Sequence, residues 1–260
     1  MPHHPRVALV GTTPATVLED YARLFALAGL NALAGRQGLL MYVPRPCRAP
    51  GLPGERAEPW QLEGALRALD TVGCTDLRVV RPSPDAADPL ADVCRRLGAR
   101  QTASGAPADV VLGACGPVGE RARLLLAGHR PALGLVDAVT VCLRDALGRP
   151  RLAIRGTLLA SADPVALDAL AARMLGLDPL RDVPAVAQAH ARGLGCGDLR
   201  IVELIGDTHL ADQRWMAAPP GPARPLACLL RRYGWPRATR EVYEDWVFNT
   251  GWGRLYRAYL

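Results

Sequence analysis

The stretch Gly156-Thr-Leu-Leu-Ala-Ser161-Ala-Asp163-Pro164-Val-Ala-Leu-Asp168 has the pattern of a strand that gives way to a helix. The strand-like run ends at Ser161, Asp163 can cap the helix, and Pro164 takes its first position, where a missing N–H costs nothing. Asp168 lies in this helix among apolar residues, and its carboxylate needs a partner because burial of an unpaired charge is costly. We therefore nominate Asp168 as the first candidate site residue and expect it to face a cleft at the edge of a sheet.

The rest of the chain alternates between strand-like and helix-like segments. Apolar runs predict strands over residues 6–10, 39–43, 77–80, 109–112, 133–143, 151–159 and 199–204. Helical periodicity or a helix-opening proline predicts helices from 14 to 28, 59 to 71, 89 to 97 and 119 to 127, and from 164 and 184 onward. Residues 144–150 resemble a hairpin turn. This alternation predicts an α/β fold, with a largely parallel sheet covered by helices.

A change in composition divides the chain into a predicted α/β domain, 1–210, and a C-terminal helical extension, 211–260. The extension holds nine of the thirteen aromatic residues, and eight arginines against four acids. We expect a helix from 239 to 248, followed by a second helical turn. This turn presents Trp252, Tyr256 and Tyr259 on one face, with Arg254 opposite.

The extension has two leading interpretations. Its aromatic face can dock on the α/β core of the same chain. Alternatively, it can bind a partner protein or a second copy of the chain, since Trp, Tyr and Arg dominate interface hot spots. The candidate interface residues are Trp246, Trp252, Tyr256, Tyr259 and Arg254. Nucleic-acid and membrane binding are disfavoured, because the net charge of +6 is modest.

Several polar features are expected to meet beyond the carboxyl ends of the strands, where open α/β sheets bind ligands. They are Thr12-Thr13, the loop 113–119, Asp137, and the Ser161/Asp163 turn. Two or three convergent carboxylates from Asp137, Asp163 and Asp168 could hold a divalent cation or a cationic group. In the alternative interpretation Asp163 is only a cap, Asp137 pairs with an arginine and Asp168 accepts backbone hydrogen bonds.

The loop Gly113-Ala-Cys115-Gly116-Pro-Val-Gly119 is a further ligand-binding candidate. Free N–H groups at a helix start can bind an anion, and such a position can also lower the pKa of a thiol such as Cys115. The glycine spacing differs from the dinucleotide fingerprint, and Glu120 would repel a phosphate. A tight turn is therefore the stronger interpretation for Gly113 and Gly116.

Composition excludes some chemistry. The chain has no lysine among its 31 basic residues, so a lysine Schiff base and a Walker lysine are excluded. Its seven cysteines form no CxxC pair, so we expect no sequence-local iron–sulfur or zinc site, no cofactor and buried, reduced thiols. We see no apolar run of membrane-spanning length and no secretory signal, so we expect a cytoplasmic protein.

The C-terminal half resembles the domain-of-unknown-function family 362. The resemblance rests on Leu135-Val-Asp137, Gly148-Arg-Pro150, Gly156, Leu159-Ala-Ser161, Asp163-Pro-Val-Ala-Leu-Asp168, Gly176-Leu-Asp-Pro179, Gly193-Leu-Gly195 and Ile205-Gly206. A looser match covers Thr12-Thr-Pro14, Leu18-Glu-Asp-Tyr21 and Pro59-Trp60-Gln-Leu-Glu-Gly64. The family's Lys-x-Asn motif is replaced here by a segment containing Met41-Tyr-Val43. Its central Lys-Thr-His segment and its ferredoxin-like cluster domain are absent from this sequence.

Two functions are compatible with the resemblance to family 362 and with the loss of these family motifs. The first is a shortened relative that keeps the scaffold and serves as a non-catalytic or accessory subunit for binding or assembly, with a protein partner, a homodimer or a small molecule. The second is an enzyme that acts on a small molecule, with or without a metal ion, through Asp137, Asp163 and Asp168.

Overall fold

The computed structural model describes residues 5–29, 33–37, 40–42, 57–80, 89–102, 109–114, 118–144, 150–215 and 235–260. The strands are β1 (Arg6–Gly11), β2 (Leu40–Tyr42), β3 (Arg78–Val80), β4 (Arg100–Thr102), β5 (Val110–Ala114), β6 (Leu133–Arg144), β7 (Pro150–Ser161) and β8 (Glu203–Gly206). The helices are α1 (Val17–Leu27), α2 (Pro59–Thr71), α3 (Pro89–Arg96), α4 (Glu120–Leu126), α5 (Pro164–Met174), α6 (Pro184–Ala191), the 3₁₀-helix η2 (Thr208–Asp212), α8 (Trp235–Asn249) and α9 (Gly251–Arg257).

The described strands form one eight-stranded sheet in the order β4-β3-β2-β5-β6-β7-β1-β8. Strand β7 is antiparallel to both of its neighbours, β6 and β1, and every other pair is parallel. The predicted α/β class with a largely parallel sheet is therefore confirmed. The predicted hairpin is confirmed as well and joins β6 to β7. The short edge strand β4 was not predicted, because its sequence Arg-Gln-Thr carries no apolar signal.

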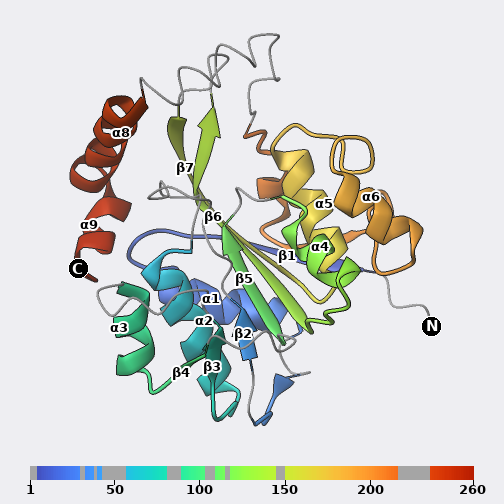
Figure 1. Ribbon diagram of the computed structural model, residues 1–260, viewed down its shortest axis with the longest axis horizontal. Coiled ribbons are helices and arrows are strands. Elements are labelled where there is room, and N and C mark those ends of the chain that lie inside the picture. The colour runs from blue at the N-terminus through green and yellow to red at the C-terminus, as the bar shows by residue number, and fades with distance from the viewer. Residues whose placement is uncertain are drawn as a thin grey trace.

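Helices cover both faces of the sheet (Figure 1), with α1, α2 and α3 on one side and α4, α5 and α6 on the other. Alternate strand residues supply the two cores, as a period of two requires. Ala8, Leu135 and Leu158 pack with α1 and α2. Their neighbours Leu9, Val136 and Leu159 pack with α5.

A bulge bends the β6–β7 hairpin between Ala138 and Thr140. Opposite it, Gly156 has a φ of 57°, and an added Cβ there would lie 2.8 Å from the Thr12 carbonyl oxygen. The Gly156 carbonyl accepts a 2.8 Å hydrogen bond from the Thr12 N–H. A side chain at this position would be strained and would also clash with the end of β1.

The C-terminal helices dock on the core of the same chain, as the first interpretation of the extension predicts. In Figure 1, α8 and α9 lie beside the β6–β7 hairpin and α2. The Trp60 ring of α2 lies 6.3 Å from that of Trp246, 5.5 Å from that of Trp252 and 6.4 Å from that of Tyr256, between centroids. The Trp246 indole N–H also donates to the Thr140 hydroxyl at 3.2 Å.

This docking changes what the interface candidates can do. Trp246, Trp252 and Tyr256 are buried within the chain, whereas Arg254 is exposed and Tyr259 is half-buried. The first three therefore stabilise the fold, and a partner interface on the extension stays a prediction. The predicted boundary at residue 211 falls inside η2, and Trp215 beyond it is fully buried in the α5 core.

Among the described residues, none of the helices combines the length and the apolar character that crossing a bilayer requires.

Candidate functional site

Asp168, the first candidate, is fully buried in an ion pair. Its Oδ1 accepts a 2.7 Å hydrogen bond from the Nε of Arg121, a residue of α4 that is itself fully buried. Its Oδ2 accepts from the Ala122 N–H at 2.9 Å. The expected burial is therefore confirmed, but the carboxylate faces α4 and is occupied there. It joins α4 to α5 and does not face the edge of the sheet.

Asp163 caps α5, as the sequence predicted. Its Oδ1 accepts from the N–H groups of Val165 and Ala166 at 2.9 and 3.0 Å, and its Oδ2 accepts from the Cys196 N–H at 2.8 Å. The Asp163 N–H in turn donates to the Ser161 hydroxyl, which donates to the Arg6 carbonyl of β1. Both candidates therefore bind backbone groups that fix the turn between β7 and α5.

The three aspartates do not meet in one site, which corrects the expected convergence. Asp137 accepts hydrogen bonds on the α1 side of the sheet, whereas Asp168 lies on α5, on the other side. The reversal of β7 explains why the Ser161 turn is also displaced. Ser161 pairs with Gly134 near the start of β6, and Asp137 pairs with Ala114 at the carboxyl end of β5. The part of the chain that the structure describes contains no cluster of three metal-binding side chains.

The remaining loop candidates are only partly described. Cys115 and Gly116 lie outside the described residues, so their predicted roles stay predictions. Gly113 pairs with Val136, so it belongs to β5 and not to the loop in which the sequence placed it. Thr12 and Thr13 follow β1, and the Thr13 hydroxyl hydrogen-bonds to that of Thr16 at 3.0 Å.

Asp137 forms a different kind of centre from the other two aspartates. Its carboxyl is buried, accepts a 2.8 Å hydrogen bond from the Val139 N–H, and accepts a second one from the Tyr21 hydroxyl at 3.2 Å. The expected arginine partner is not found among the described residues. Burial raises the pKa of Asp137 to about 6, and hydrogen bonds from Val139 and Tyr21 and the nearby Trp60 and Gln61 groups oppose that rise.

Trp60 and Gln61, in the first turn of α2, complete this centre. Both side chains are buried and lie near enough to favour the ionised carboxylate of Asp137. The Trp60 indole N–H, the only polar group of that side chain, acts on the Asp137 carboxyl. The Gln61 Oε1 has no hydrogen-bond partner among the described residues. Buried polar groups in native proteins almost always bind something, so this acceptor requires an explanation. We call Tyr21, Trp60, Gln61 and Asp137 the Asp137 centre.

Close helix packing positions the Tyr21 side chain in this centre. A Cβ added to Gly64 of α2 would lie 2.6 Å from the Tyr21 ring. Only a glycine therefore allows α2 to approach α1 so closely. Burial, assisted by the charge of Asp137, raises the pKa of Tyr21 well above its ordinary value, so this hydroxyl stays a donor at neutral pH.

Part of this centre can be predicted from the sequence. Asp137 follows a buried strand and is a candidate on that ground, whereas Tyr21, Trp60 and Gln61 have only the family resemblance to indicate them. They lie on two helices far from Asp137 in the sequence. Only the tertiary packing of α1 and α2 on β6 brings them together.

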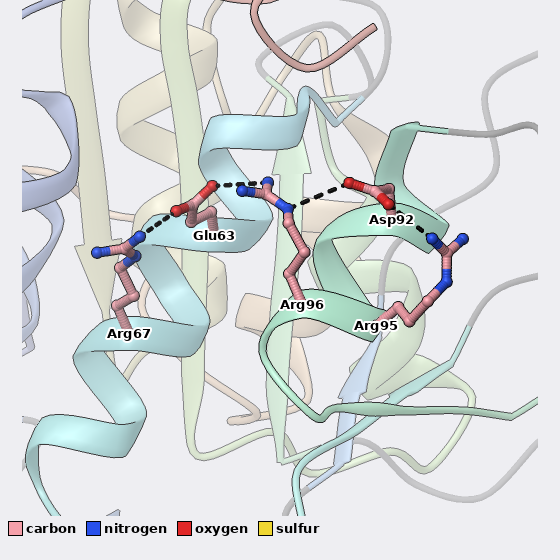
Figure 2. Close-up of polar contacts among 5 residues, drawn as sticks. All are labelled: Glu63, Arg67, Asp92, Arg95 and Arg96. Atoms are coloured by element: carbon pink, nitrogen blue, oxygen red, sulfur yellow. Dashed lines mark hydrogen bonds and ion pairs between the residues drawn. The ribbon is translucent and has the colours of Figure 1, made fainter.

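A second buried carboxylate, that of Glu63, lies on α2, one turn after Trp60. Figure 2 shows its contacts: Glu63 contacts Arg67 at 2.5 Å and Arg96 at 3.2 Å, and Arg96 also contacts Asp92 at 3.1 Å. Its charge is therefore balanced by two arginines. The Arg96 guanidinium also lies 5.5 Å from the centroid of the Tyr259 ring, which attaches the end of the chain to α3.

Comparisons with known proteins add no relative: no protein-family model, no curated protein and no solved structure matches the chain. The resemblance to family 362 therefore stays a prediction.

Proposed function

We propose that the protein is a small-molecule-binding protein whose ligand lies at the Asp137 centre, and that it serves in binding rather than in three-aspartate catalysis. The supporting observation is the contrast in counter-ions. Asp168 pairs with the buried Arg121, and Asp163 accepts hydrogen bonds from the N–H groups at the start of α5. At the Asp137 centre the described groups that face the buried carboxyl are all uncharged, and the Gln61 side-chain oxygen is buried without a described partner.

The position of the centre supports the same proposal. Asp137 lies level with the carboxyl end of β5, and α2 supplies residues from its first turn. Ligands of open α/β sheets bind at this edge. The accessory role implied by the family resemblance is compatible with a binding protein of this kind.

A thermal-shift screen tests the proposal. The wild type would be heated with a panel of free amino acids, amines, nucleobases, sugars and carboxylic acids. We expect at least one compound to raise the Tm, because a ligand that binds only the folded state stabilises it. Gln61→Leu should abolish that increase, whereas Gln188→Leu, at an exposed position on α6, should retain it.

Two results would contradict the proposal. One is that no compound raises the Tm, or that Gln61→Leu responds as the wild type does. The other is that the stabilising compound is converted to a product by the isolated chain, which would restore an enzymatic role.

A further inference from the structure

The ligand class can be inferred from the charge of the Asp137 centre, and this step rests on the function proposed above. The described groups that face the Asp137 carboxyl are Tyr21, Trp60, Gln61 and the Val139 N–H, none of which is charged at neutral pH. Asp168, which is equally well buried, has Arg121 as its counter-ion. A buried carboxylate without a basic partner is costly unless a cation joins it.

Two aromatic side chains contact the same carboxylate: Tyr21 donates to it, and the Trp60 indole lies beside it. On its other contacts, the Trp60 ring packs against Trp246, Trp252 and Tyr256, with ring centroids between 5.5 and 6.4 Å from its own. The faces of such rings carry partial negative charge and attract organic cations. The carboxylate and the rings therefore favour the same kind of ligand.

The Gln61 side-chain oxygen adds a second requirement. This oxygen is an acceptor without a described partner, so it can receive an N–H from an ammonium group that also binds Asp137. We propose that the Asp137 centre binds a small organic cation that carries an ammonium group.

The neighbouring carboxylate does not compete for this ligand. Glu63 lies one turn away on the same helix, but Arg67 and Arg96 already balance its charge (Figure 2). An organic cation near Glu63 would meet two guanidinium groups. Of these two buried carboxylates of α2 and β6, only Asp137 presents a net attraction.

Nuclear magnetic resonance of the full chain with ¹⁵N-labelled tryptophan tests this inference. The probes are ethanolamine and choline, each compared with its uncharged isostere, 1-propanol and 3,3-dimethyl-1-butanol. We expect at least one cation to shift the Trp60 indole signal, identified by its loss in Trp60→Phe, and to bind at least about tenfold more tightly than its isostere. The Trp215 indole, buried in the α5 core, is the internal control and should not move.

One substitution and one pH series show whether the charge of Asp137 causes the binding. Asp137→Asn should weaken binding of the cation about tenfold or more, because it removes a charge-assisted partner. In the wild type, binding should weaken as the pH falls below 6. If Asp137→Asn does not fold, Gln61→Leu and the pH series still decide the question.

The possible failures are distinguishable. If an isostere shifts the Trp60 signal as strongly as its cation does, the centre binds small molecules but the cationic class is wrong. If neither cation shifts the signal, the cationic class is also overturned, whatever the metabolite panel shows. A shift of Trp215 as large as that of Trp60 would mean that binding is not specific to the centre.

Discussion

Asp168 and Asp137 are both buried aspartates, and they lie on opposite sides of one sheet. Asp168 has a buried arginine as its counter-ion and also accepts from a backbone N–H. Asp137 has only uncharged partners, which are Tyr21, Trp60, Gln61 and a backbone N–H, and no described counter-ion. The difference shows that burial of a carboxylate in an apolar surrounding does not by itself identify a ligand site. The charge of its partners decides whether it is structural.

The largest effect is expected on the Asp168 side. Arg121→Met leaves a buried carboxylate without its counter-ion, so we expect unfolding free energy to fall by about 3–5 kcal/mol. Urea denaturation measures this loss. The control Arg95→Met removes an exposed partner of Asp92 and should cost less than about 0.5 kcal/mol. A loss below about 1 kcal/mol for Arg121→Met would remove the distinction between the two aspartates.

The pH dependence of stability sharpens the comparison on the Asp137 side. The folded-state pKa of Asp137 is raised to about 6 from an ordinary value of 3.8, so the folded chain binds this proton more tightly than the unfolded chain. The contribution of this group to stability is therefore greatest below pH 4 and is lost as the pH rises to 6. The expected loss is roughly 3 kcal/mol.

The measurement is the difference in unfolding free energy between wild type and Asp137→Asn across pH 4 to 8. The variant lacks this titration, so its stability relative to the wild type should increase between pH 4 and 6 and then stay constant. A difference that does not change with pH would show that Asp137 titrates normally.

Asp163 extends the comparison to a third carboxylate. Asp163→Ala removes acceptors from three backbone N–H groups, so we expect it to cost about 1–2 kcal/mol. Asp163→Asn keeps one acceptor oxygen for the cap and should cost less. Urea denaturation of the two variants separates them. Loss of ligand binding in either one, with the fold intact, would reassign Asp163 to the binding site.

The smallest effect is expected where the extension contacts the hairpin. Trp246→Phe keeps an aromatic ring against Trp60 but loses the N–H that donates to Thr140, so we expect a cost of about 1 kcal/mol. Thermal denaturation measures this change. An unchanged Tm would show that the aromatic contact alone holds α8 on the core.

The sequence predicted the layers of the fold well, because strand and helix periodicities are local. Pro164 and the Asp163 cap also fixed the start of α5 correctly. The reversal of β7 was the critical difference for the site: it is a property of strand order, and it moved Ser161 away from Asp137. The partner of Asp168, Arg121, is 47 residues distant, and no local pattern identifies such a pair.

The central claim is that Asp137 holds a cation-accepting charge in the folded protein. A ¹³C titration of the aspartate carboxyl signals, with Asp137 assigned through its Asn variant, tests this claim most directly when repeated with saturating ethanolamine. We predict that Asp137 titrates at about pH 6 in the free protein and that ethanolamine lowers this pKa, because a bound cation stabilises the carboxylate. A pKa near 4 in the free protein, or one that ethanolamine leaves unchanged, would contradict the claim.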